Sequence, residues 1–167
     1  MTCQLAIWLA QCWWKHDIIY LPKGAKGNNM ITKGMLTSNK DDWETPQDLF
    51  DKLNAFYGFT LDACASPENA KCKKYYTKEQ NSLVQDWNND TIWCNPPYGR
   101  EIGKFVRKAY LCCSLVVMLL PARTDTKWFH DYIYGKQRIF FLKGRLKFSN
   151  SKTPAPFPSM IVVFNNY

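Results

Sequence analysis

The sequence lacks the features that mark membrane-spanning and zinc-binding proteins. No apolar run reaches the ~18 residues that a membrane helix needs, and the run from Ser114 to Leu120 ends at Pro121. The 167 residues include only two histidines and no Cys-x-x-Cys pair, so the usual ligand spacings of a zinc site are missing. We therefore expect no membrane span and no bound metal.

Seven cysteines are present, but their positions do not indicate a disulfide framework. Cys64, Cys94 and Cys112 lie within apolar runs that are typical of a protein core. The chain also shows no export signal, because no basic residue precedes its first apolar segment. These observations favour reduced thiols and a cytoplasmic location.

The first 36 residues differ in composition from the rest. An apolar segment with three tryptophans is followed by a stretch rich in Gly, Lys and Asn, which is a linker composition. We expect residues 1–36 to be an extension that is dispensable for a domain formed by residues 37–167. The alternative is a helix that packs on the domain or on a partner.

The net charge of +8 is unevenly distributed. Twelve Lys and Arg and only three acidic residues lie between Arg100 and Lys152, whereas Thr37 to Gly99 contains six basic and ten acidic residues. A solvated surface is one explanation. The other is a nucleic-acid footprint, which the aromatic residues among the basic ones favour.

Strand and helix signals alternate along the chain. Thr45 as N-cap, Pro46 at the first position and Gly58 at the end delimit a helix. The other expected segments are strands at 59–64, 91–94, 114–120 and 160–164, helices at 101–111 and after Thr124, a strand–glycine turn–strand at 138–148, and a weakly structured stretch at 71–78. This order predicts a three-layer α/β domain with a mostly parallel sheet, in which ligands bind at the carboxyl ends of strands.

The tetrapeptide Asn95-Pro96-Pro97-Tyr98 follows the apolar run Thr91–Cys94. Two prolines cannot continue a strand, so the chain must turn there with a stiff backbone. An amide oxygen and a proline carbonyl can accept both hydrogens of an exocyclic amine, and the tyrosine ring can stack on a planar base. The turn therefore predicts a site for a flat, amine-bearing group; the simpler alternative is a turn that only ends the strand.

This turn resembles the Asn-Pro-Pro-Tyr motif of methyltransferases that use S-adenosylmethionine to methylate amines on planar systems. Five further segments extend the similarity: Trp43–Pro46, Leu61–Lys71, Leu119–Thr126, Gly144–Phe148 and Ala155–Ser159. Together they resemble the phage-type DNA N6-adenine methyltransferase (Dam-like) family over about residues 42–164. The resemblance implies a Rossmann-like methyltransferase fold with an antiparallel strand near the C-terminus, and an enzyme encoded by a phage or prophage that acts in the host cytoplasm.

The family resemblance also assigns roles to the turn. Asn95 and the carbonyl of Pro96 would accept hydrogen bonds from the adenine N6 amine, and Pro97 would stiffen the turn. Tyr98 would stack on a base that has swung out of double-stranded DNA, because a paired N6 is not accessible.

S-adenosylmethionine is the cofactor that the resemblance implies, with a contact set of Trp43, Thr45, Pro46, Asp62, Cys64 and Asp86. The helix start at Thr45-Pro46 would meet its carboxylate, Asp62 its ammonium and Asp86 its adenine amine. A turn cap is the alternative for Asp62, and an ordinary loop acid for Asp86. The chain departs from many methyltransferases here, because Ala63 to Ser66 stands in place of a glycine-rich loop.

The basic residues near these segments are candidate phosphate contacts, although each alone is also explained as a surface charge. The set is Arg100, Arg123, Arg138, Lys143, Arg145 and Lys147. The segment from Gly144 to Ser159 is the candidate for reading the duplex. Two alternatives remain open at this point: methylation of RNA or of a protein glutamine amide, and a catalytically inactive nucleic-acid-binding protein.

Overall fold

A mostly parallel sheet forms the centre of the molecule in a computed structural model that describes residues 42–165. The expected extension at residues 1–36 lies outside this range. Within the range, the sheet has six strands in the order β2-β1-β3-β4-β6-β5. Their bounds are β1 Leu61–Asp62, β2 Lys74–Tyr75, β3 Ile92–Cys94, β4 Val116–Pro121, β5 Arg138–Phe141 and β6 Ser159–Phe164. Strands β1 to β4 are parallel, and β6 runs antiparallel to both β4 and β5, so the expected sheet is confirmed.

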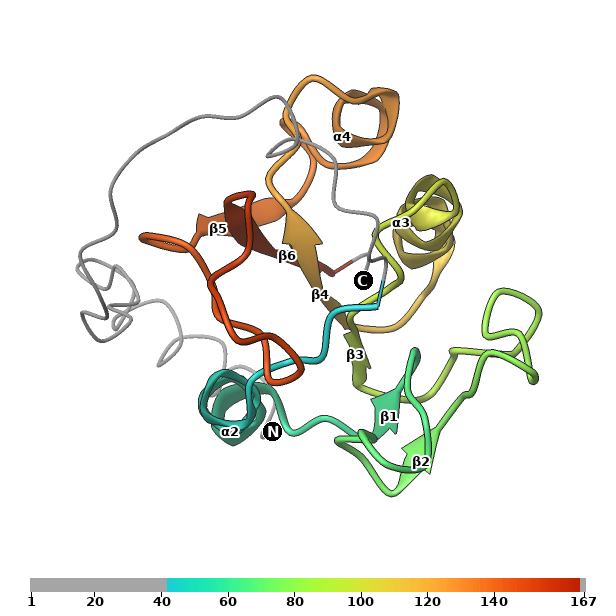
Figure 1. The fold of residues 1–167 in the computed structure, drawn as a ribbon. Helices are drawn as coiled ribbons and strands as arrows, with labels where there is room; N and C mark the ends of the chain where they lie inside the picture. Colours follow the sequence, from blue (N-terminus) through green and yellow to red (C-terminus); the bar gives the residue numbers. More distant parts are fainter. Residues whose placement is uncertain (1–41, 166–167) are drawn as a thin grey trace.

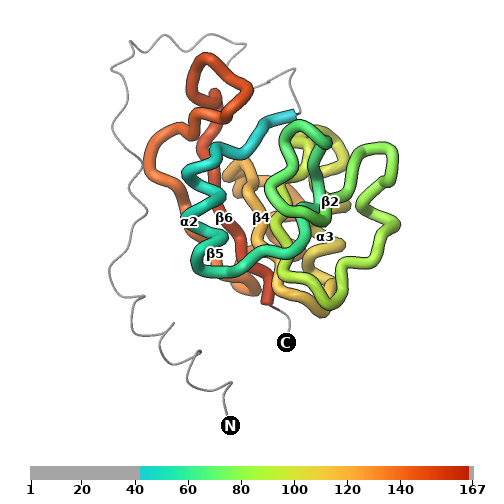
Figure 2. The backbone as a smooth tube through the Cα atoms, turned by 90° about the horizontal axis from the view of Figure 1, so that it is seen from below, coloured from blue at the N-terminus to red at the C-terminus, as the bar shows by residue number. Residues whose placement is uncertain are grey.

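Helices cover both faces of this sheet (Figure 1). Helix α2, Gln47–Tyr57, lies on one face, and α3, Ile102–Leu111, and α4, Lys127–Tyr132, lie on the other. The loop of residues 142–158, between β5 and β6, lies on the same face as α2 and runs beside the segment that leads into it (Figures 1 and 2). The architecture is therefore the three-layer α/β arrangement that the alternating pattern predicts.

The core is centred on β4 and β6. All six residues of each strand are buried, which explains why both read as continuous apolar runs without alternation. On the α2 face, Leu49, Phe50 and Leu53 are the buried residues of the helix. Burial of each such side chain stabilises the fold by about 1.5–3 kcal/mol. Among residues 42–165, no helix is long and apolar enough to cross a membrane.

The start of α2 differs from the expectation. The helix begins at Gln47, and Pro46 occupies the N-cap position with an extended backbone and no side-chain cap. Thr45 is thus not the N-cap, because its side chain is buried and bonded elsewhere. Gly58 ends the helix in the left-handed conformation with φ 67°, as expected.

Three further expectations required correction. The polar stretch at 71–78 contains β2, whose two residues are too few to produce a periodic pattern. Thr126, not Thr124, is the N-cap residue of α4, and the Thr126 hydroxyl donates to the Arg123 carbonyl at 2.8 Å. Only the first half of 138–148 is a strand, because the chain turns at Gly144 with φ 82° and then continues as a loop.

Candidate active site

A cavity of about 710 Å³ opens at the carboxyl ends of β1 and β3. Its volume lies within the range of small-molecule sites in proteins. Four segments supply most of its walls: residues 42–45, 62–66, 76–83 and 95–101. The turns after β1 and β3 therefore meet at one site, as the parallel sheet predicts, whereas the turn after β4 does not line this cavity.

Asn95 lies on the cavity wall immediately after β3, and its amide has a fixed orientation. The Nδ2 group donates to the carbonyl of Trp43 and, at 3.2 Å, to the Oγ1 atom of Thr45. Both hydrogens of the amide thus have acceptors. The Oδ1 atom is buried and has no hydrogen-bond partner among the described residues.

A buried acceptor without a partner costs about 1–3 kcal/mol, a cost that a ligand donating a hydrogen bond to Oδ1 would remove. Pro96 and Pro97 lie beside Asn95 on the same wall. Their rings restrict the backbone of the turn. The arrangement holds a rigid oxygen acceptor without a described partner in a residue of the cavity wall, which suits an amine donor.

Asp62 ends β1 and lies on the cavity wall. Its carboxylate accepts from the N–H groups of Cys64 at 3.2 Å and Lys71 at 3.0 Å, so the residue does cap a turn. Burial raises the pKa of this carboxyl, and the two backbone hydrogen bonds partly oppose that effect. Each carboxylate oxygen accepts one of these bonds and keeps capacity for another.

The expected cofactor contacts separate into two groups. Trp43, Thr45, Asp62 and Cys64 line the cavity, whereas Pro46 does not. Ala63 and Ala65 also line it, and their small side chains leave room near the end of β1.

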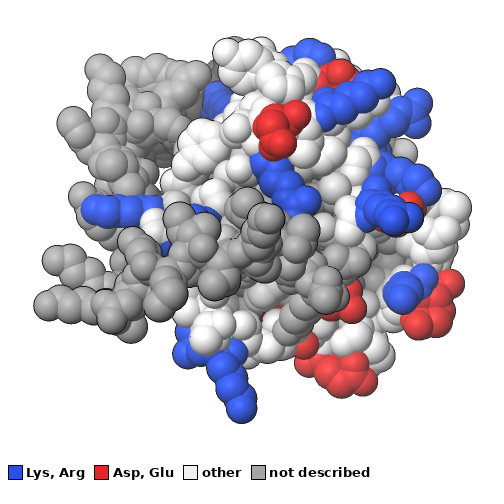
Figure 3. Space-filling model, turned by 45° about the horizontal axis from the view of Figure 1, so that its top comes forward, with Lys and Arg blue, Asp and Glu red and all other residues white. Residues whose placement is uncertain are grey.

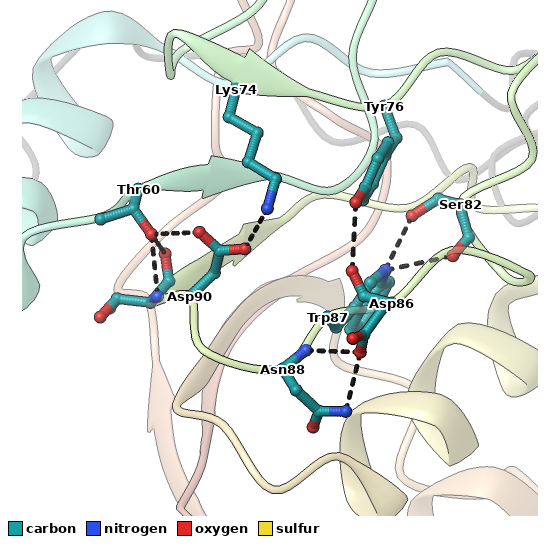
Figure 4. A network of polar contacts seen from close by, with 9 residues as sticks. Thr60, Lys74, Tyr76, Ser82, Asp86, Trp87, Asn88 and Asp90 are labelled. Carbon is teal, nitrogen blue, oxygen red and sulfur yellow. Dashed lines mark hydrogen bonds and ion pairs between the residues drawn. The ribbon is translucent and has the colours of Figure 1, made fainter.

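Asp86 does not line this cavity and lies in the loop before β3. Its carboxylate accepts from the backbone N–H of Asn88 at 2.9 Å and from the Asn88 side chain at 2.7 Å. Figure 4 shows this carboxylate turned toward Asn88, while the Asp86 carbonyl faces the hydroxyl of Tyr76. The structure therefore places Tyr76, not Asp86, on the cavity wall.

Tyr98 is buried, with 5% of its surface exposed. Its hydroxyl donates to the Leu119 carbonyl at 3.2 Å, and its ring packs against Phe148 and Phe157 at centroid distances of 6.0 and 5.5 Å. Burial raises the pKa of the phenol well above its usual value. The ring is not on the cavity wall, so base stacking by Tyr98 requires the ring to become exposed and stays a prediction.

The six candidate phosphate contacts are all exposed, and the strand register divides them. Arg100 lies on the rim of the cavity. Arg123 follows the carboxyl end of β4. The end of β5 lies at the same edge of the sheet, with β6 between the two strands, and is followed by Lys143, Arg145 and Lys147. Arg138 starts β5 opposite Val163, toward the other edge of the sheet. Figure 3 shows lysine and arginine side chains spread over the face that it presents, with acidic side chains among them.

The loop of residues 142–158 holds the cavity wall through contacts that the sequence did not indicate. Ser149 donates from its backbone N–H to the Glu44 carbonyl at 3.0 Å and from its hydroxyl to the Thr45 carbonyl at 3.2 Å. Asn150 accepts from the Glu44 N–H at 3.2 Å. No local pattern reveals these bonds, because more than a hundred residues separate the partners.

The sequence predicts reduced thiols and no bound metal, and the cysteines of the described residues bear on both expectations. The five cysteines among residues 42–165 are free, and the Cys64 and Cys94 sulfur atoms lie 3.7 Å apart. Burial raises the pKa of the Cys94 thiol well above its usual value, so this thiol stays protonated. The described part of the chain contains no group of three or more His, Cys, Asp or Glu able to hold a metal ion.

A cavity at the carboxyl ends of a mostly parallel sheet defines the class of the protein as a three-layer α/β domain, a class in which ligands bind at that edge of the sheet. The family model of DNA N-6-adenine-methyltransferase (Dam) matches residues 33–166. A DNA N-6-adenine-methyltransferase of Haemophilus phage HP1 is 34% identical over 147 residues, which cover 81% of this chain and 85% of that protein. One of Escherichia phage T1 is 38% identical over 112 residues, or 64% of this chain and 47% of that protein.

The chain therefore belongs to the DNA N6-adenine methyltransferase (Dam) family. This assignment confirms the resemblance seen in the sequence. It also confirms that the protein is an enzyme of adenine N6 methylation in DNA.

Proposed function

We propose that this enzyme transfers the methyl group of S-adenosylmethionine to N6 of an adenine in double-stranded DNA, and that Asn95 holds the target amine. The observation that carries the proposal is the buried Oδ1 atom of Asn95, which has no partner among the described residues. An adenine N6 amine supplies the donor that this acceptor lacks. The family assignment supports the same substrate atom.

The chemistry at the turn follows from hydrogen bonding. Asn95 Oδ1 accepts one N6 hydrogen, and the Pro96 carbonyl is the candidate acceptor for the second. Accepting both hydrogens shifts electron density from the adenine ring to N6 and makes the nitrogen a better nucleophile. Pro97 keeps the turn rigid, so the amine is held in place, which can supply several kcal/mol of rate enhancement.

The side chains that line the cavity suit the chemical groups of S-adenosylmethionine. Asp62 would bind the ammonium of its methionine part, since this buried carboxylate keeps acceptor capacity. Ala63 and Ala65 leave space beside the end of β1, and the half-buried Tyr76 offers an aromatic surface. When bound, the cofactor supplies an electrophilic methyl group on its sulfonium.

The role of Asp62 predicts a specific pH dependence of cofactor binding. Because burial raises the pKa of Asp62, its carboxylate takes up a proton at a higher pH than an ordinary aspartate does. We expect cofactor affinity to be present above this raised pKa and to be lost as the pH falls through it. Asp62→Asn should weaken binding by roughly 10- to 100-fold and remove this pH dependence.

Calorimetric titration with S-adenosylmethionine across the acidic range measures this effect. Asp51→Asn, an exposed carboxylate on α2, is the matched control and should bind as the wild type does. An Asp62→Asn variant with unchanged affinity and an unchanged pH profile would remove Asp62 from the cofactor site.

The exposed cations of the 142–158 loop predict salt-sensitive DNA binding. Replacing Arg145 and Lys147 by glutamine should raise the KM for duplex DNA and reduce the slope of log KM against log salt by up to about two, because each lost phosphate contact removes about one counterion. Lys52 and Lys136, exposed on α2 and after α4, form the charge-matched control pair. Equal slopes for the two double variants would show that the loop does not contact DNA.

Methyl-label transfer tests the substrate. The purified enzyme is incubated with labelled S-adenosylmethionine in three separate reactions. One contains duplex DNA, one RNA and one a protein extract. We expect label on the duplex and none without the cofactor. Label on RNA or on protein alone would contradict the proposal, as would the absence of cofactor binding at millimolar concentration.

A further inference from the structure

We propose that Thr45 is a positioning residue, whose hydroxyl accepts the second Nδ2 hydrogen of Asn95 and so holds the amide in the orientation that the Trp43 carbonyl selects, with Oδ1 toward the target amine. This inference rests on the proposed role of Asn95. The sequence places Thr45 among the cofactor contacts through the helix start at Thr45-Pro46, whereas this inference assigns the Thr45 side chain to the target site. The Trp43 carbonyl accepts the other hydrogen of the same amide.

The hydrogen-bonding geometry selects one amide orientation. Two acceptors, the Trp43 carbonyl and Thr45 Oγ1, receive the two hydrogens of Asn95 Nδ2. A carbonyl oxygen accepts only and cannot donate. Rotating the amide by half a turn would therefore place Oδ1 against the Trp43 carbonyl oxygen, which is repulsive, and would leave the NH₂ group facing the target amine.

Burial makes this selection effective. The Thr45 residue is 4% exposed, so water cannot readily replace its hydroxyl as an acceptor. The side chain has no capping role, because α2 begins at Gln47 without a side-chain cap. Its hydroxyl accepts a hydrogen bond from Asn95, fifty residues away in the chain, which connects the start of α2 to the turn after β3.

The segment that supplies both acceptors is itself held by the 142–158 loop. Ser149 donates to the carbonyls of Glu44 and Thr45. The side chain of Asn150 accepts from the Glu44 N–H and donates to the Asp42 carbonyl at 3.1 Å. Residues 42–45 are thus bonded on one side to this loop and on the other to Asn95. A loop expected to face DNA is thereby connected to the acceptor expected to face the target base.

Two substitutions separate positioning from cofactor binding. Thr45→Val keeps the shape of the side chain and removes the hydroxyl, which leaves one buried Asn95 hydrogen without an acceptor. We expect kcat to fall about tenfold, the lower end of the cost of an unsatisfied buried donor. The dissociation constant for S-adenosylmethionine should stay within about twofold of wild type. Thr45→Ser keeps the hydroxyl and should restore kcat to within about twofold of wild type.

Thermal unfolding establishes that each variant is folded. Thr45→Ala, which removes the same hydroxyl without adding a methyl group at that position, is measured in parallel in case the valine variant does not fold. A wild-type kcat in both hydroxyl-free variants would overturn the inference. Weaker cofactor binding with an unchanged kcat would also overturn it and would return Thr45 to the cofactor site.

Asn95→Ala distinguishes failure of this inference from failure of the proposed function. If Asn95→Ala is inactive and the hydroxyl-free Thr45 variants behave as wild type, only the positioning role of Thr45 is wrong. If Asn95→Ala keeps more than about a tenth of wild-type turnover, the proposed role of Asn95 fails, and the inference fails with it.

Discussion

Asn95→Ala is expected to lower the rate of DNA methylation by about 100-fold or more. Loss of a single preorganised hydrogen-bonding group at a reacting centre typically has an effect of this size. The substitution removes the Oδ1 acceptor, which has no hydrogen-bond partner within residues 42–165. Binding of S-adenosylmethionine should change little, because the role of Asn95 is at the target amine. Single-turnover methylation of duplex DNA, together with calorimetry of the cofactor, measures the two effects separately.

Asn165→Ala is the matched control, since Asn165 is exposed just after β6. It should methylate at the wild-type rate. An Asn95→Ala enzyme that keeps more than about a tenth of wild-type turnover would contradict the assigned role. Lost cofactor binding in Asn95→Ala, with no change in unfolding temperature, would move Asn95 from the target site to the cofactor site.

Phe148→Ala is expected to produce the largest loss of stability among the substitutions considered. Phe148 is 1% exposed. Its ring packs against the rings of Trp43 and Tyr98, with centroid distances of 4.9 and 6.0 Å. Truncating a buried phenylalanine costs about 3–5 kcal/mol in the free energy of unfolding, or roughly 10 °C in melting temperature for a domain of this size. Activity should also fall, because Trp43 holds the Asn95 amide.

Phe141→Ala provides the control. Phe141 ends β5 with 59% of its surface exposed, and a surface substitution of this kind usually changes stability by no more than about 0.5 kcal/mol. Thermal and urea unfolding of the two variants give the comparison. Equal stabilities would show that the packing of Phe148 against Trp43 and Tyr98 does not stabilise the fold.

The sheet was predictable from sequence where burial alone sets the pattern. Strands β4 and β6 are buried on both faces, so continuous apolar runs predict them directly. The turn at Asn95 was predictable because two prolines must end a strand, and the parallel order then placed it beside the turn after β1. Strand β2 was not predictable, since two residues carry no period.

The site was less predictable wherever a side chain's partner is distant in the chain. Thr45 has the residue type and position of an N-cap, yet its hydroxyl bonds to Asn95 instead. Asp86 lies near β3 in the chain, but its carboxylate turns to Asn88. Arg138 and Arg145 look alike as isolated basic residues, and only the register of β5 and β6 separates them. In each case, the folded arrangement of the chain set the partner or the position of the side chain, and the local sequence pattern did not reveal it.

The role proposed for Asn95 is to present a fixed acceptor to the N6 amine of adenine in DNA. Its most direct test is mass spectrometry of nucleosides from duplex DNA treated with the enzyme and S-adenosylmethionine. We expect N6-methyladenine in DNA treated with the wild type, and at least about 100-fold less with Asn95→Ala. Equal amounts of N6-methyladenine from the two enzymes, or methylation of another base, would contradict it.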